Sequence, residues 1–448
     1  MTAPRPPALA RAPRFPCGWA AGLLLSAILI LPGCQGWRPA SMLAFARGDA
    51  PADPALQAGL APAAAASPII SDLMARPSIL PQDSPYARVA RAVLSAAPGV
   101  ETAELGLARL RAEAVAANRW PGLTPVLTLD AIVGLAAQLL VDQPLMDHGR
   151  RKAERDRAAA ELDLAAVTLS TRQNARVFDG LSLYLTAEQA RVQGAIAEAA
   201  TARLQALQQV VSARVAGGLS DRSEEQIIAQ TVAEMQATHA ADLQTRAQAL
   251  ADLGALAATA PPADLTGTAP LLPLPPAEPL SVLRATAEGA RTLAEARISR
   301  AAALPGLSAT AAITDQGVAP GLRLGGVRIG PGSPATLAVA NAAPELVARQ
   351  TADQRQTADR RRTELAGRVA TLHSARVQGA DVLRRTRENL DLYVDQYRMG
   401  RRSLTDLTAQ TAAAARLERD QAALDFEIAR LELELARDAG LLVEGGSL

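Results

Sequence analysis

Two long stretches of the chain carry apolar side chains at helical spacing. In the first, residues 150–215 contain no proline, so nothing interrupts a helix. Its apolar stripe, at steps of three and four residues, consists of Leu162, Ala165 and Leu169, then Val177, Leu181 and Tyr184. Charged residues fall on the other faces. About 65 residues at a rise of 1.5 Å predict a helix about 100 Å long, which no globular domain needs.

The second stretch, near the C-terminus, has the seam of a coiled coil. Leu383, Leu390 and Tyr397 recur every seven residues. Farther on, alternating steps of four and three residues relate Leu417, Gln421, Leu424, Ile428, Leu431 and Leu435. A solvated helical hairpin would explain either seam alone, so the order of elements around the seams has to decide what they mean.

Four shorter stretches predict β-strands in two pairs. Residues 123–130 pair with 135–141, and residues 306–313 pair with 321–329. Their apolar alternation is weak, which is typical of the strands of membrane barrels. In the last stretch Leu322-Arg323-Leu324 alternates, and Gly325-Gly326 predicts a bulge.

The two halves of the chain repeat each other. AEAVAANRWPGL ends a helical pattern at Pro121, and ARISRAAALPGL ends one at Pro305, an offset of 184 residues. RVAGGLSDRSEE parallels YRMGRRSLTDL, where pairing Gly218 with Gly400 gives an offset of 182 residues. Two matches at nearly one offset indicate a duplicated unit. Each unit is predicted to contain a short helix, two strands, a very long helix, a glycine turn and a second long helix.

These patterns divide the chain into six segments. They are a signal peptide (1–33), a Pro- and Ala-rich arm (34–86), the first repeat (87–257), a Pro-rich linker (258–281), the second repeat (282–440) and a C-terminal tail (441–448). The arm shows no sustained period, and we expect it to be flexible or to wrap over the surface. The prolines of the linker exclude a helix there. In the second repeat, the long helix is expected to begin near Pro344.

The N-terminus has the features of a secretory signal. Three arginines precede the apolar run WAAGLLLSAILILPG, which is short for a membrane span. Leu31-Pro32-Gly33-Cys34 resembles a bacterial lipobox, in which the Cys becomes the acylated first residue, although Pro32 stands where Ser or Ala is usual. An ordinary cleaved signal or an uncleaved anchor is the alternative. Since Cys17 would be removed, the mature chain has no second Cys for a disulfide.

Composition argues against a catalytic or nucleic-acid-binding protein. Aromatic residues make up only 2% of the chain, which is poor material for the core of an enzyme. The net charge is +1, and the sequence has no cluster of basic residues of the kind that binds nucleic-acid phosphates. His148, His239 and His373 share no metal-ligand spacing. The mature chain has no phosphate loop and no HExxH, GxSxG or CxxC motif. We therefore expect no enzyme, no cofactor and no metal, with His148 as a polar turn residue.

A set of motifs follows one order along residues 89–440. They are AANRWPGL and AAALPGL before the strands, QPLMDHGRRKAERDRA after them, GLSDRSEEQ and GRRSLTDLTAQ between long helices, and ALDFEIARLELELARDAGLL at the end. In this order they resemble the TolC-type outer-membrane efflux and secretion channel family. The resemblance implies a mainly α fold, in which duplicated helical hairpins form an α-barrel tunnel. Four β-strands per subunit would contribute to a 12-stranded trimeric membrane β-barrel.

The resemblance also implies a function, a location and partners. The chain would form a passive exit across the outer membrane and periplasm for a tripartite efflux pump or a type I secretion system, gated at its periplasmic helix tips. Its partners would be two further copies in a homotrimer, a periplasmic adaptor (membrane fusion protein), an inner-membrane transporter and outer-membrane lipid. Independently of the family, an open sheet edge in lipid leaves backbone groups unsatisfied at several kcal/mol each. Membrane-inserted strands would therefore have to close between subunits.

The resemblance implies that five residues of this chain occupy the gate positions of the family. Counted from Gly400, the constriction carboxylate falls on Asp406, and a second acidic position holds Ala409 instead. Three copies of Asp406 would form a negative ring that favours cations. The links that close the tips are carried by Tyr397, Arg402, Ser223 and Glu224. Tyr397 would donate to Glu224, and Arg402 to Ser223 or the backbone beside it.

Prolines and glycines mark where elements change. The predicted junctions of strand and helix are at Pro121, Pro305, Pro144 and Gly149. Gly218 and Gly400 would supply the φ-tolerant residue where each long helix turns back. The alternative to a channel is a periplasmic coiled-coil adaptor or a helical lipoprotein that does not insert. An adaptor, however, should show one helical hairpin flanked by compact β domains.

Overall fold

The computed structural model describes residues 67–97, 99–117, 121–130, 134–218, 221–257, 266–314, 317–325 and 332–447. The predicted signal peptide, the lipidation site at Cys34 and most of the N-terminal arm lie outside these residues.

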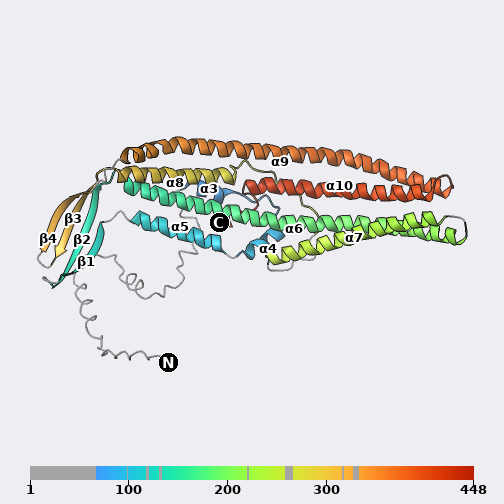
Figure 1. The fold of residues 1–448 in the computed structure, drawn as a ribbon, viewed down its shortest axis with the longest axis horizontal. Coiled ribbons are helices and arrows are strands. Elements are labelled where there is room, and N and C mark those ends of the chain that lie inside the picture. The colour runs from blue at the N-terminus through green and yellow to red at the C-terminus, as the bar shows by residue number, and fades with distance from the viewer. Residues whose placement is uncertain are drawn as a thin grey trace, which may run out of the picture. The chain divides into compact units, whose positions relative to one another are not determined.

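The first repeat is built along one helix of 67 residues, α6 (Arg150–Ala216). α5 (Val100–Ala117) precedes it, α7 (Arg222–Ala257) follows it, and both pack against it. The hairpin of β1 (Gly122–Asp130) and β2 (Gly134–Met146) stands between α5 and α6 in the chain (Figure 1). The long helix predicted from the proline-free pattern is confirmed.

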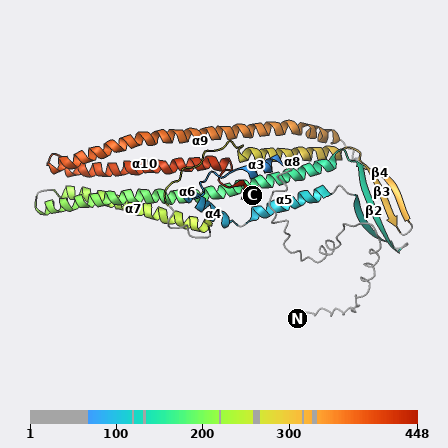
Figure 2. The ribbon, with the colours of Figure 1, turned by 180° about the vertical axis from the view of Figure 1, so that it is seen from behind.

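The second repeat has the same order of elements. It consists of α8 (Leu280–Ala302), β3 (Leu307–Thr314), β4 (Gly317–Leu324), α9 (Ser333–Arg398) and α10 (Leu404–Asp438). In both views α9 runs beside α8 and α10, and α10 also lies along α6 (Figures 1 and 2). The mainly helical fold with duplicated hairpins and four strands is therefore as predicted.

The predicted start of α9 near Pro344 is wrong. The helix begins at Ser333, and Pro344 lies inside it. Proline in a helix interior removes one hydrogen bond and crowds the preceding turn, at a cost of about 3 kcal/mol. Pro344 itself is exposed, whereas Val347 is buried against Gly289 of α8. Packing of the residues beside the proline against α8 keeps the helix continuous there.

The four strands form one antiparallel sheet in the order β1-β2-β3-β4, so β2 and β3 join the two repeats. The fourth strand, predicted over residues 321–329, is wrong in its position. Thr314 pairs with Gly317, and this short connection fixes the register four residues earlier than expected. Pro320 is tolerated within β4 because β4 is an edge strand in the single chain. The N–H of Gly325 donates to the Gly306 carbonyl at 2.6 Å, just beyond the strand end.

Two helices that we did not predict lie before α5. α3 (Pro68–Ala75) and α4 (Pro85–Ser95) both begin with a serine cap and a proline in the first turn. The described end of the arm is therefore partly helical. Tyr86 and Val93 of α4 are fully buried in the main core, together with Leu181 of α6. The serine caps are a local signal for both helices, and α4 also has apolar residues at helical spacing, of which Tyr86, Val89, Ala90 and Val93 are buried.

The segment after α10 also packs into the core. Leu441 is fully buried, and the N–H of Leu442 donates to Oδ1 of the buried Asn174 on α6 at 2.9 Å. A short 3-10 helix, Gly445–Ser447, follows. Burial of the chain end on α6 anchors the C-terminus of α10 to the first repeat.

The predicted seams are buried to different degrees. In α6 the stripe that contains Leu169, Val177 and Leu181 is buried, because α5, α7, α8 and α10 all contact this helix. On α10, Ile428 and Leu431 are buried. The four buried residues of α9 are Ala343, Val347, Leu365 and Leu383. Most of the surface of α9 is thus uncovered in the single chain.

Candidate functional site

The strand register gathers apolar side chains on one face of the sheet. Leu123 lies opposite Val141, Leu139 opposite Ile313, and Ala309 opposite Leu322. Along β4 the residues of this face are Val318, Pro320, Leu322 and Leu324, and Leu322 and Leu324 are 72% and 75% exposed. Gln143, opposite Ala309, is the polar residue of this face. Large exposed apolar residues gathered on one face of a sheet are typical of a surface that contacts lipid or another protein.

The opposite face of the sheet is different in chemistry. It carries Thr124 on β1, Asp142 on β2, Ser308 and Thr310 on β3, and Arg323 on β4, among small and apolar residues. Alternation of an apolar and a polar face along each strand is the pattern of a strand with lipid on one side and an aqueous lumen on the other. Among the helices of the described residues, none has a stretch that is both long and apolar enough to cross a membrane.

The predicted junction residues lie where strands meet helices. Pro121 directly precedes β1, and Pro144 lies beside a register shift near the end of β2. Gly149, with φ of +81°, is the N-cap of α6. His148 also has a positive φ of 50°, and its Nε2 donates to the Pro305 carbonyl at 2.8 Å. His148 thus ties the exit of β2 to the entry of β3, a contact between repeats that the sequence did not indicate.

Asp147 caps the first turn of α6. Its carboxylate accepts from the N–H of Gly149 at 3.0 Å and from the N–H of Arg151 at 2.9 Å. Partial burial opposes the charged form of this carboxyl, but these hydrogen bonds outweigh it and lower the pKa of Asp147. The charged cap, with the helix dipole, sets the direction in which α6 leaves the sheet.

The two glycine turns have the same backbone geometry. Gly218 and Gly400 both have φ of +70°, directly beyond the ends of α6 and α9. After α9, the N–H of Gly400 donates to Tyr397 O at 2.9 Å and the N–H of Arg401 to Gln396 O at 2.8 Å, which satisfies the last carbonyls of the helix. Side chains with a Cβ rarely adopt this conformation.

We expect Gly218→Val or Gly400→Val to reduce the amount of assembled oligomer. A β-branched residue at φ of +70° is strained by about 1–2 kcal/mol, which opposes the reversal of the helix. Oligomer yield after detergent extraction measures the effect. Gly217→Ala is the matched control, because Gly217 has φ of −84°. Normal yield of both valine variants would contradict the role of these turns.

The predicted gate residues lie at the turns of the two hairpins. Asp406 is exposed in the first turn of α10, and its N–H donates to Oγ of the cap residue Ser403 at 3.0 Å. Arg402 donates to Gln396 at 3.1 Å, and its guanidinium lies 4.7 Å from the ring centroid of Tyr393. In the single chain Arg402 therefore contacts its own hairpin and not Ser223. The link to Ser223 stays a prediction.

An apolar cluster joins the two hairpins near their turns. Val211 of α6, Ile228 of α7 and Leu404 of α10 are buried together, and the half-buried Tyr397 of α9 packs against them. Ser223 is exposed and Glu224 is half-buried in the first turn of α7. Polar links were expected here, and the structure adds an apolar contact that involves one of the predicted residues.

A buried ion pair between the hairpins was missed by the sequence analysis. Arg419 of α10 pairs with Asp242 of α7, and their side chains are only 15% and 12% exposed. Nη1 of Arg419 also donates to the carbonyl of Gln193 on α6 at 2.7 Å. Three helices from both repeats therefore meet at this pair. No local pattern could indicate it, because Asp242 and Arg419 are 177 residues apart.

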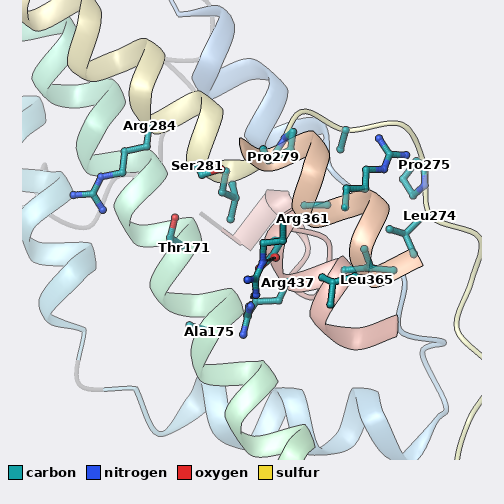
Figure 3. A pocket seen from close by; sticks show the side chains of 17 residues that line it. Thr171, Ala175, Leu274, Pro275, Pro279, Ser281, Arg284, Arg361, Leu365 and Arg437 are labelled. Carbon is teal, nitrogen blue, oxygen red and sulfur yellow. Dashed lines mark hydrogen bonds and ion pairs between the residues drawn. The ribbon is translucent and has the colours of Figure 1, made fainter. Parts of the chain in front are cut away.

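A cavity of about 430 Å³ lies between α6 of the first repeat and α8, α9, α10 and the linker (Figure 3). Leu280 of α8, Leu365 of α9 and residues 274–279 of the linker give it a largely apolar lining. Arg361 and Arg437 lie side by side at its wall and share Glu434 and Asp438, so the charges of this network balance. Arg361 and Arg437 therefore do not offer an uncompensated charge to a ligand.

The linker side of the cavity has no helix. Leu274, Pro275, Ala277 and Pro279 line the cavity from the segment before α8, which forms no helix or strand. In the first repeat, by contrast, Tyr86 and Val93 of α4 are buried in one cluster with Leu181 of α6.

The histidines of the described residues have separate contacts. Nδ1 of His239 donates to the Gly194 carbonyl at 2.9 Å, and His373 lies 3.6 Å from Glu432. Within the part of the chain that the structure describes, no group of three or more His, Cys, Asp or Glu side chains could hold a metal ion.

Comparison with known proteins identifies the fold. No family model and no curated protein sequence matches the chain. Among solved structures, a membrane protein from Pseudomonas aeruginosa has a TM-score of 0.68 at 18% identity, over 82% of this chain and 92% of that chain. The outer membrane protein VceC from Vibrio cholerae has a TM-score of 0.68 at 15% sequence identity, over 79% of this chain and 96% of that chain. The outer-membrane channel OprN has a TM-score of 0.68 at 16% sequence identity, over 82% of this chain and 93% of that chain. The chain has the fold of these outer-membrane proteins, as the resemblance to the TolC-type channels predicted.

Proposed function

We propose that the chain is a subunit of a trimeric outer-membrane channel that continues into a periplasmic tunnel. The observation that carries this proposal is the sheet with one exposed apolar face and one polar face. β1 and β4 are edge strands in the single chain. In lipid their unpaired N–H and C=O groups would cost several kcal/mol each, so the sheet has to close with other copies. Three copies of four strands make a barrel of twelve.

The helical hairpins would form the tunnel. α6 and α9, with 67 and 66 residues, would each extend about 100 Å if straight. α9 keeps most of its surface uncovered, which suits contact with a neighbouring subunit or a water-filled duct. The duct would give passive exit to cargo delivered by an inner-membrane transporter through a periplasmic adaptor, in a tripartite pump or a type I secretion system.

We further propose the gate and the anchor that the family resemblance implies. Asp406, exposed near the turn of the α9–α10 hairpin, would form the acidic ring of the periplasmic aperture. Tyr397, Arg402, Ser223 and Glu224 would link the tips. Acylation of Cys34 would tether the N-terminus to the outer membrane.

The proposal is tested with the full chain and a Cys34→Ser variant. We expect both to be recovered from outer-membrane fractions as oligomers that dissociate only on heating, and to conduct ions in planar lipid bilayers. A lipoprotein that does not insert, or an adaptor, would behave differently, since the Cys34→Ser protein would then be released without detergent. Such release, together with the absence of conductance, would reject the channel.

A further inference from the structure

The turns of the two helical hairpins are not joined to each other through the chain. α6 and α9 both start at the sheet, and the turns at Gly218 and Gly400 do not connect one hairpin to the other. Side-chain contacts between the hairpins therefore decide how far apart their turns lie. Near the turns these contacts are apolar, and they include Ala415 and Leu404 of α10.

The Arg419–Asp242 pair is a stronger and more directional contact. Besides its closest contact, the guanidinium makes a second hydrogen bond to Asp242, from Nη2 to Oδ1 at 3.0 Å, so the pair is bidentate. Nη1 of Arg419 donates to the backbone carbonyl of Gln193, and the side-chain Nε2 of Gln193 donates to the backbone carbonyl of Arg419 at 3.3 Å. This reciprocal contact fixes the axial position of α10 relative to α6, with Arg419 beside Gln193.

The first repeat is shaped to receive this arginine. Gly194 follows Gln193, and a Cβ at Gly194 would lie 3.4 Å from Cβ of Asp242 and 3.7 Å from Nδ1 of His239. The glycine lets α7 approach α6 closely, and His239 donates to the Gly194 carbonyl one turn from Asp242. These contacts place Asp242 close to α6 within the first repeat.

We propose that Arg419 and Asp242 form a latch that holds the α9–α10 hairpin against α6 and α7 and sets the closed position of the tunnel. This inference rests on the proposed channel function. The latch lies 15 residues, or about 22 Å of helix, from Leu404 at the start of α10, and so is separate from Asp406 and the predicted tip links. A bond at this height restrains the whole segment of both hairpins between it and the turns.

The test compares wild type with Asp242→Asn and Arg419→Met in planar lipid bilayers. Removing one partner leaves the other charge buried and unpaired, which favours separation of the hairpins, so we expect the open probability to rise at least about tenfold. The double variant Asp242→Leu/Arg419→Met has no unpaired charge and lacks the directional contact. We expect it to open more than wild type as well.

The matched control is Glu234→Gln. Glu234 and Arg416 join the same two helices at 3.7 Å, but their side chains are 52% and 69% exposed, so this pair contributes little. An equal rise in Glu234→Gln would reject the latch in favour of a general charge effect. Unchanged open probability in the Asp242 and Arg419 variants would also reject the latch, while leaving the proposed channel intact. If neither single variant nor the double variant forms oligomers, the pair is a folding determinant and the latch is likewise rejected. A wild-type protein that never conducts would instead overturn the proposed function.

Discussion

Leu322→Arg will reduce the fraction of the protein that inserts in the outer membrane as an oligomer. Leu322 lies on the apolar face of β4 opposite Ala309 and is 72% exposed in the single chain. If that face contacts lipid, an arginine there costs about 2–4 kcal/mol per chain near the middle of the bilayer. The measurement is the amount of heat-dissociable oligomer extracted by detergent from outer-membrane fractions.

Ala319→Arg is the control for this prediction. Ala319 is exposed on the same strand, but the alternation of β4 puts it on the opposite face, opposite Ala312. An arginine there would face the aqueous side, so insertion should change little. Equal loss of insertion in both variants would mean that β4 tolerates no large side chain on either face. No loss in Leu322→Arg would contradict contact of that face with lipid.

Arg76→Met is expected to destabilise the region where α3, the linker and the end of α10 meet. Arg76 is only 4% exposed, and its guanidinium donates to the carbonyls of Ala439 at 2.6 Å and Glu278 at 2.8 Å. Methionine retains an apolar stem but leaves these carbonyls without their donor, at a cost of about 2–4 kcal/mol in the free energy of unfolding. We expect a lower apparent melting temperature in detergent and faster proteolysis within residues 266–279.

Asp72→Asn separates the role of the backbone contacts from that of the ion pair. Asp72 accepts from Arg76 at 2.6 Å, but its side chain is 48% exposed, so the pair is well screened. This variant keeps both carbonyl contacts of Arg76 and should change the melting temperature much less. If the two variants behave alike, the ion pair, and not the capping of the carbonyls, is the stabilising contact.

The glycine turns and the first strand pair could be predicted because their signals are local. Gly218 and Gly400 were expected at helix reversals, and both have the positive φ that only glycine adopts easily. The first strand pair was predicted close to β1 and β2, since a proline and a glycine flank it. β4 was misplaced because its proline and glycines resemble a turn, and only pairing with β3 determines its register.

Contacts between distant segments were the part that could not be predicted. A proline ordinarily ends a helix, yet α9 continues through Pro344 where Val347 packs on α8. The short helices α3 and α4 are stabilised by the core they enter and have no long periodic pattern of their own. For both, tertiary burial outweighs the local preference.

The sequence alone determined the duplication, the length of α6 and the positions of the helix turns, because these depend on periodicity and on backbone preferences within a few residues. Only the folded chain decided that His148 reaches Pro305, that Arg419 reaches Asp242, and that a cavity lies between α6 and the second repeat. Those features depend on which faces of two helices meet and on the axial position of one helix relative to the other. Helical periodicity specifies a face, but complementary shape and charge across the interface select its partner.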